Sequence, residues 1–242
     1  MRGFFLALQF LTRLPVPAVR DFQADELARS AVWFPLVGLL LGGLLALLGL
    51  AVRPFDPWLA ALLVLLAWVW LTGGLHLDGL ADTFDALGAA HRDRERFLQV
   101  LSDPHVGSFG VIALVLQLAA KLVLLGVAFG HGVPLLALLL IPAWARLGAL
   151  WWAQSLPPLK PGLGERFKWR AGRWLPLLWL TVLLAASLPF TGLWLAPLAL
   201  WFWQRFLLLK VGGMTGDCLG AGVEISESLL LLAVVIGLGL PL

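Results

Sequence analysis

The chain has 242 residues, of which 61% are hydrophobic and 13% are charged. Soluble domains carry roughly 45–50% apolar and about 25% charged residues. Together with a mean hydropathy of +0.94, this composition excludes a soluble single-domain enzyme, a disordered protein and a disulfide-rich secreted scaffold. The single cysteine, Cys218, leaves no internal disulfide and is too few for a zinc site. The net charge of +3 does not indicate nucleic-acid binding, because the charges lie between apolar runs, as in a polytopic membrane protein.

Six apolar runs approach the length of about 20 residues that a helix needs to cross a bilayer. They lie near 31–52, 57–74, 109–129, 133–152, 173–190 and 193–209, and a shorter seventh run occupies 228–242. At 1.5 Å per residue the seventh run covers roughly 22 Å, which suits a tilted or incomplete crossing. We expect an all-α bundle of six or seven transmembrane helices that forms a single membrane domain over 1–242.

The first 29 residues form a segment of a different kind. Their apolar stretch is interrupted by Arg13, Pro15 and Pro17, is too short to span, and is not followed by a cleavage site of the signal-peptide type. We therefore expect an interfacial or re-entrant helix in 1–29.

Basic residues gather in every second connection, which places the N-terminus and those connections in the cytoplasm by the positive-inside rule. The basic residues of these segments are Arg2, Arg13, Arg20, Arg29, Arg92, Arg94, Arg96, Lys160, Arg166, Lys168, Arg170, Arg173 and Lys210. The acids are distributed in the same way, because Asp56 alone lies on the predicted outer side and the other thirteen lie on the cytoplasmic side. We therefore expect the chemistry at the cytoplasmic face of the membrane.

The stretch 73–86 is the most informative motif. Its carboxylates Asp78, Asp82 and Asp85 are spaced i, i+4, i+7 and fall within about 60° of one another on a helix. Carboxylates on one stripe repel one another unless a cation lies among them, and hard oxygen ligands suit Mg²⁺ with substrate phosphates. The alternative is a solvated acidic face. His76, beside the stripe, fits a ligand, a general base or a structural hydrogen bond.

A second cluster runs from Lys210 to Glu227 and is rich in glycine. Glycines let the backbone approach a ligand closely and expose N–H groups to an anion, although they also serve close helix packing. We take Asp217 and Glu224, seven residues apart, as candidate catalytic acids on one face. Candidate substrate-binding residues of this cluster are Gly212, Gly213, Thr215 and Gly216.

Other polar residues stand at or within the predicted spans. Asp103 precedes Pro104 in a turn-rich entry to the span near 109–129, so it fits either a turn or a substrate contact. Arg146 and Arg205 lie toward the cytoplasmic ends of their spans, where they either snorkel or bind a diphosphate. Lys121 lies nearer the bilayer centre, where pairing with an acid or a carbonyl is expected.

The sequence resembles the cobalamin synthase family of adenosylcobinamide-GDP ribazoletransferases. The matching pieces are 10–17, 73–86, 103–110, 142–146 and 212–227, in the family's order and over nearly the whole chain. The 73–86 piece is the most specific of them. His105 departs from the arginine expected in many relatives, so no phosphate contact is assigned to it.

The resemblance implies a Mg²⁺-dependent inner-membrane enzyme of cobalamin assembly. Such an enzyme joins adenosylcobinamide-GDP to α-ribazole or α-ribazole 5′-phosphate and releases GMP. Its partners are these substrates and the lipid bilayer, with self-association left open and no nucleic acid required. In this hypothesis the stripe from Asp78 to Asp85 holds one or two Mg²⁺ ions, Asp217 or Glu224 completes the site or takes the hydroxyl proton, and Arg146 and Arg13 contact phosphate.

Other functions fit the sequence less well. A CDP-alcohol phosphatidyltransferase also holds metal on an acidic stripe, but its pattern requires arginine after Ala81, where this chain has Asp82. A cation-coupled transporter places ionisable groups near the midplane, often within inverted repeats, whereas these acids gather at one face. A purely structural subunit leaves the stripe without a purpose.

Overall fold

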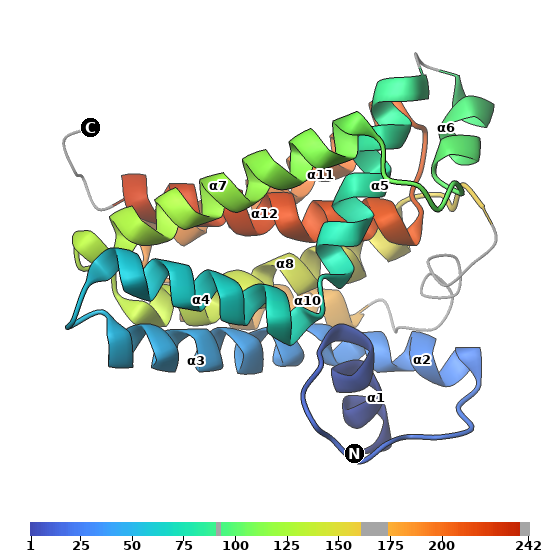
Figure 1. The fold of residues 1–242 in the computed structure, drawn as a ribbon. Helices are drawn as coiled ribbons and strands as arrows, with labels where there is room; N and C mark the ends of the chain where they lie inside the picture. The colour runs from blue at the N-terminus through green and yellow to red at the C-terminus, as the bar shows by residue number, and fades with distance from the viewer. Residues whose placement is uncertain (91–92, 161–173, 238–242) are drawn as a thin grey trace.

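The computed structural model describes residues 1–90, 93–160 and 174–237, and its regular elements are helices (Figure 1). They are α1 (Arg2–Leu11), α2 (Ala24–Ser30), η1 (Ala31–Trp33), α3 (Phe34–Val52), α4 (Pro57–Thr72), α5 (Leu75–Ala90), α6 (Arg94–Val100), α7 (Ser108–Gly130), α8 (Leu135–Ser155), α10 (Trp174–Ala186), η2 (Thr191–Leu195), α11 (Ala196–Lys210) and α12 (Gly216–Ile236). Pairing of the β type within the described ranges is limited to an isolated bridge between Pro158 and Met214. The predicted all-α polytopic bundle is confirmed.

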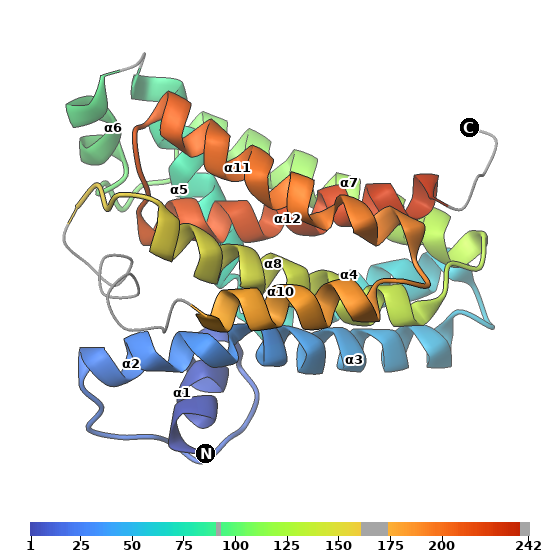
Figure 2. The same ribbon diagram turned by 180° about the vertical axis from the view of Figure 1, so that it is seen from behind.

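The axes of the long helices lie roughly along one direction, and α5 stands across one end of them (Figures 1 and 2). Helix α12 runs through the middle, in contact with α5, α7, α8 and α11, while α3 packs along α8. This last contact is close because Gly38 and Gly42 face the α8 backbone, where a Cβ at Gly42 would lie 2.3 Å from the Leu139 oxygen. Helices in lipid associate through small residues of this kind.

Five stretches of the described residues are long and apolar enough to cross a membrane. They are Asp25–Val52, Ser108–Gly130, Leu135–Ser155, Thr191–Lys210 and Gly216–Ile236. A sixth is reached by counting Pro57–Thr72 with Leu75–Ala90, two helices that meet at an angle of 85°. The expected crossings near 31–52, 57–74, 109–129, 133–152 and 193–209 all correspond to these helices.

Two expected spans differ from the structure. The run near 173–190 yields a helix of 13 residues, α10, which ends at Ala186 shortly before Pro189, and residue 173 lies outside the described ranges. The run at 228–242 is the second half of α12, which already begins at Gly216, while 238–242 are not described. Gly220 and Gly222 do not interrupt this helix because they serve as packing surface: a Cβ at Gly222 would lie 2.3 Å from Trp203 Nε1.

The N-terminal segment lies beside the end of the bundle that α5 crosses (Figure 1). Helix α1 buries Leu6, Ala7, Leu8 and Leu11 and packs against α2 and α3. The chain that follows it is tied to α4, because the Arg13 N–H donates to the Leu71 oxygen at 2.7 Å. This short, one-sided helix has the form expected of an interfacial segment.

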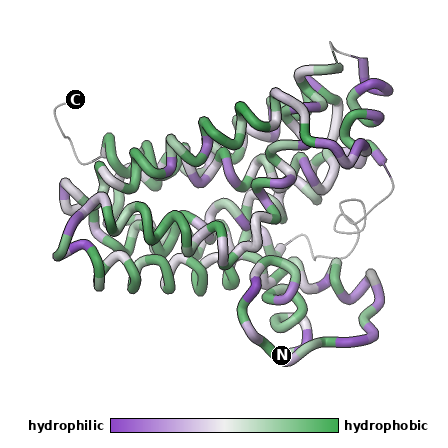
Figure 3. Tube along the Cα trace, in the orientation of Figure 1, coloured by the Kyte–Doolittle hydropathy of each residue, from purple (hydrophilic) through white to green (hydrophobic). Residues whose placement is uncertain are grey.

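Hydrophilic residues concentrate at the same end, over α2, α5 and α6 (Figure 3). The sequence assigns thirteen acids to this face; Glu165 lies outside the described ranges, and two of the other twelve do not lie on the face. Glu224 and Glu227 are buried within α12, at 3% and 0% exposure, because the connection expected between the runs near 193–209 and 228–242 is helical from Gly216 onward. Arg92 and the basic residues of 161–173 lie outside the described ranges.

Candidate active site

A tight bend between α4 and α5 creates the site. Gly73 and Gly74 have φ values of 63° and 73°, a left-handed conformation that glycine adopts without steric cost. Gly73 ends α4, and α5 leaves at 85°. Arg13 lies over this bend, since a Cβ at Gly73 would come within 2.5 Å of the Arg13 Nε. The bend therefore carries the acidic stripe across the end of the bundle.

Helix α5 then packs closely against the start of α12. A Cβ at Gly79 would lie 2.8 Å from the Asp217 carbonyl oxygen, and one at Gly220 would lie 3.5 Å from the Cα of His76. This approach brings carboxylates from two distant segments together: the negative charges of Asp78, Asp217 and Asp85 all act on Asp82. The sequence pattern predicts that Asp217 and the stripe share a membrane side, and the family resemblance implies that Asp217 or Glu224 completes the site.

Asp217 stands in the first turn of α12. Thr215 caps this helix by accepting from the Cys218 N–H at 3.3 Å, and its hydroxyl donates to Asp217 Oδ2 at 3.3 Å. Lys160 Nζ lies 3.8 Å from the same carboxylate oxygen. Asp217 is thus held in place while its carboxylate stays partly exposed.

Asp85 differs from its two neighbours on the stripe. It is buried, and its carboxylate oxygens accept from the N–H groups of Gly107 at 2.7 Å and Gly110 at 2.8 Å. These contacts satisfy donors at the beginning of α7, as a capping side chain does. Asp78 is exposed and Asp82 half-buried, so Asp78, Asp82 and Asp217 are the carboxylates that remain open to a ligand.

The open carboxylates fit magnesium only as part of its ligand shell. Over 1–90, 93–160 and 174–237, no three His, Cys, Asp or Glu side chains are arranged to hold a metal ion by themselves. Magnesium, however, usually binds through one or two carboxylates and completes its shell with substrate phosphates and water. Asp78 and Asp82, one helical turn apart, supply such a pair.

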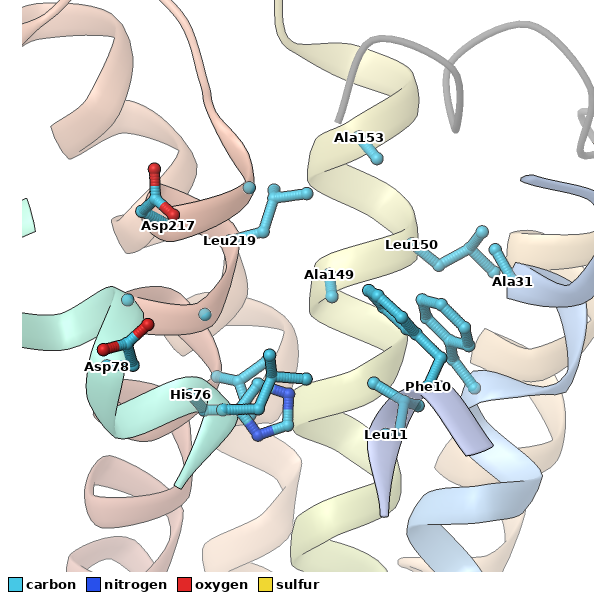
Figure 4. Close-up of a pocket in the computed structure, with 16 residues that line it drawn as sticks. Phe10, Leu11, Ala31, His76, Asp78, Ala149, Leu150, Ala153, Asp217 and Leu219 are labelled. Atoms are coloured by element: carbon cyan, nitrogen blue, oxygen red, sulfur yellow. The ribbon is translucent and has the colours of Figure 1, made fainter. Parts of the chain in front are cut away.

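A pocket of about 210 Å³ opens beside these carboxylates (Figure 4). Asp78 and Asp217 stand on one side, while Phe10 and Leu11 of α1 face them across a surface of α8 that includes Ala149. Pockets that enclose a whole drug-sized ligand measure roughly 300–1,000 Å³. This one therefore accommodates a part of a large substrate, with polar atoms toward the acids and apolar atoms toward α1 and α8.

A buried ion network lies beneath the pocket; we use this name for Lys121, Arg146, Glu224 and Glu227. Lys121 Nζ lies 2.6 Å from Glu224 Oε2 and 2.5 Å from Glu227 Oε2, and Arg146 Nη1 donates to Glu227 Oε1. All four side chains are at most 4% exposed. Arg146 is predicted from the sequence to bind phosphate, and Glu224 to complete the catalytic site. In the structure both residues contact buried, oppositely charged partners.

Sequence reasoning did not single out Glu227, although a signal for it exists. Lysine and arginine inside apolar helices need acidic partners, and Glu224 and Glu227 fall on one helix face at i, i+3. Once 216–236 is taken as a single helix, these are the acids placed to meet them. Treating 210–227 as a loop concealed this pairing.

The remaining predicted residues lie around the pocket or away from it. Gly216 lines it, whereas Arg13, Asp103, Gly212, Gly213 and Thr215 do not. Gly213 packs instead on the chain after α8, where its added Cβ would lie 2.3 Å from the Pro157 oxygen. Asp103 is exposed and accepts from the His105 backbone N–H at 3.0 Å and contacts its ring at 2.7 Å, and these hydrogen bonds lower the pKa of Asp103 below its ordinary value.

Comparison with known proteins identifies close relatives. Residues 3–235 match the model of a family described as cobalamin-5-phosphate synthase. A protein of Thiobacillus denitrificans named adenosylcobinamide-GDP ribazoletransferase is 56% identical over 242 residues, covering 99% of this chain and 97% of the relative. One of the same name from Laribacter hongkongensis is 58% identical over 249 residues, covering 100% of both, and one from Novosphingobium aromaticivorans is 49% identical. No solved structure gives a significant match.

Proposed function

The chain belongs to the cobalamin-5-phosphate synthase family, and on this premise we propose that it is an adenosylcobinamide-GDP ribazoletransferase. The ribose hydroxyl of α-ribazole, or of its 5′-phosphate, attacks the phosphorus that is linked to adenosylcobinamide. The bond from this phosphorus to GMP breaks, GMP leaves, and the hydroxyl proton passes to a base. The product is adenosylcobalamin or its 5′-phosphate.

One observation carries this proposal: Asp78 and Asp217 line a pocket from two helices that glycines bring into contact, and the charges of both act on Asp82, one helical turn from Asp78. Phosphoryl transfer asks little covalent chemistry of a protein, which has to align the groups and neutralise charge on the phosphoryl oxygens. Asp78 and Asp82 would hold Mg²⁺, which supplies that neutralising charge when bound. Asp217, on the same side of the pocket as Asp78, would take the hydroxyl proton.

The start of α12 adds a second favourable feature for phosphate. The N–H groups of its first turn and its dipole attract negative charge, and Gly216, at this position, lines the pocket. The absence of a side chain there leaves the backbone open to a phosphoryl oxygen. We assign Gly216 rather than Gly212 or Gly213 to substrate contact.

The proposed enzyme lies in the inner membrane with its site at the cytoplasmic face. The end of the bundle that holds α5 also holds α2 and α6 and is rich in hydrophilic residues (Figure 3). Arg2, Arg29 and Arg94 lie in α1, α2 and α6 at or beside this end. Basic residues favour the cytoplasmic side. Nucleotide substrates are available on that side.

The test uses the purified full chain in detergent with adenosylcobinamide-GDP and α-ribazole, and follows GMP release with Mg²⁺ and with EDTA. We expect GMP and a cobalamin product only with Mg²⁺. Asp82→Asn should lower the rate by more than the roughly 10- to 100-fold that outer-shell changes cost at metal sites. Glu95→Gln, a change of an exposed acid on α6, is the matched control and should leave the rate unchanged.

The outcomes separate the two parts of the proposal. Folded protein that releases no GMP from these substrates overturns the activity. Wild-type rate and Mg²⁺ dependence in Asp82→Asn overturn the magnesium assignment and leave the activity standing.

A further inference from the structure

His76 connects the pocket to the buried ion network. It lies in the first turn of α5, lines the pocket, and is 5% exposed. Its Nδ1 is 3.4 Å from Arg146 Nη2. A guanidinium only donates hydrogen bonds, so Nδ1 is the acceptor in this contact and carries no proton. The neutral ring then carries its proton on Nε2.

Arg146 is held in the position that makes this contact. Its Nη1 donates to Glu227 Oε1 and, at 3.3 Å, to the Pro142 carbonyl oxygen. The other oxygen of Glu227 contacts Lys121 at 2.5 Å. Lys121 of α7 and the carboxylates Glu224 and Glu227 of α12 thus fix the guanidinium of Arg146, and through it the ring of His76.

In the pocket, the Nε2–H group can serve as a hydrogen-bond donor to a bound substrate. Among the described residues that line it, His76 is the one whose side chain carries an N–H donor, and the others are apolar, glycine or aspartate. Figure 4 shows the ring between the carboxylate of Asp78 and the apolar side formed by Phe10 and Leu11. A substrate group that enters there meets Nε2 as its side-chain donor.

We propose that His76 donates a hydrogen bond from Nε2–H to an acceptor atom of the substrate, and that Arg146 and Glu227 are positioning residues that fix this tautomer. The acceptor is a lone pair, on either a phosphoryl oxygen or a heteroaromatic nitrogen. The inference rests on the proposed function and deepens it. It also removes His76 as a general base, because a ring that accepts at Nδ1 and donates at Nε2 has no lone pair free for a hydroxyl proton.

The first test reads the tautomer directly, without substrate or turnover. The full chain carries ¹⁵N-labelled histidine, and the other three histidines, His91, His105 and His131, are replaced by glutamine. Protonated and bare ring nitrogens differ strongly in ¹⁵N chemical shift. We expect a protonated Nε2 and a bare Nδ1 in the parent protein, and a mixture of tautomers in Arg146→Lys. A protonated Nδ1 in the parent overturns the proposal.

The second test separates donor from base. The amide of glutamine reaches the place of Nε2, whereas the shorter asparagine reaches that of Nδ1. We expect kcat/KM of His76→Gln to exceed that of His76→Asn by about tenfold, the worth of one hydrogen bond. The substrate whose KM rises in His76→Asn, adenosylcobinamide-GDP or α-ribazole, is the one that supplies the acceptor.

Equal losses in His76→Gln and His76→Asn overturn the donor role, since a general base is replaced by neither amide. If the wild-type chain releases no GMP, the proposed function fails, and the NMR experiment still decides whether Arg146 sets the tautomer.

Discussion

Lys121 is the residue whose removal tests the buried ion network most directly. Its Nζ contacts Glu224 Oε2 at 2.6 Å and Glu227 Oε2 at 2.5 Å, and it lies over the Trp68 ring, 4.5 Å from the centroid. The side chain is 3% exposed. Lys121→Met preserves the unbranched stem and removes the charge, so a network of two cations and two carboxylates keeps one cation.

The expected cost follows from these contacts. Removing one partner of a buried ion pair costs about 3–5 kcal/mol, because an uncompensated charge is left behind. In a chain of this length each kcal/mol lowers Tm by roughly 2–4 °C. Lys121→Met should therefore melt roughly 6–20 °C below the parent. The loss should be smaller in Lys121→Met/Glu224→Gln, which restores equal numbers of buried positive and negative charges.

Thermal unfolding in detergent micelles, followed by far-ultraviolet circular dichroism, measures this shift. Arg205→Met is the matched control, because it removes an exposed cation from the apolar helix α11 and should change stability by at most about 0.5 kcal/mol. The reasoning is refuted if Lys121→Met melts with the parent, or if the double variant melts below the single one.

Two further changes probe the neighbourhood of the pocket. Gly79→Ala should lower GMP release at least about tenfold with little loss of helicity, because its Cβ would come within 2.8 Å of the Asp217 oxygen and a misplacement of catalytic groups by about 1 Å is costly. Gly130→Ala, where an added Cβ meets nothing within 4 Å, should leave turnover unchanged. Asp85→Asn should lower stability by roughly 0.5–2 kcal/mol, as loss of a cap does, without changing the Mg²⁺ concentration at half-maximal rate; a shifted Mg²⁺ dependence would instead make Asp85 a metal ligand.

The membrane architecture could be predicted because hydropathy and charge report it directly. A helix in lipid has to satisfy its own backbone, so long apolar runs permit few other structures. The crossings near 109–129 and 133–152 become α7 and α8 with ends shifted by only a few residues. The sequence shows two adjacent glycines at Gly73 and Gly74, but it does not predict the angle of the bend, because this angle depends on the contact between α5 and α12.

The segment 210–227 shows where local sequence misleads. Glycine weakens a helix by about 1 kcal/mol per residue relative to alanine, so a glycine-rich stretch favours a loop when it is considered alone. Here Gly220 and Gly222 lie against His76 and Trp203, and the packing that their small size permits outweighs the propensity. Information of this kind resides in the partner helix, which the local pattern does not contain.

The ion network explains how an enzyme can keep a fixed site on a helix that stands across the end of a bundle. Helix α5 leaves α4 through two glycines, a residue type that permits many backbone directions, so the connection alone does not set the direction of α5. Its contact with α12 at Gly79 sets the distance between the acids, but apolar packing alone permits sliding. The hydrogen bond from Arg146 to His76 is directional, and Arg146 is anchored through Glu227 to α12 and, through Lys121, to α7. Four charges buried in a membrane protein are expensive, and here they hold the helix that carries the acidic stripe at one position relative to Asp217.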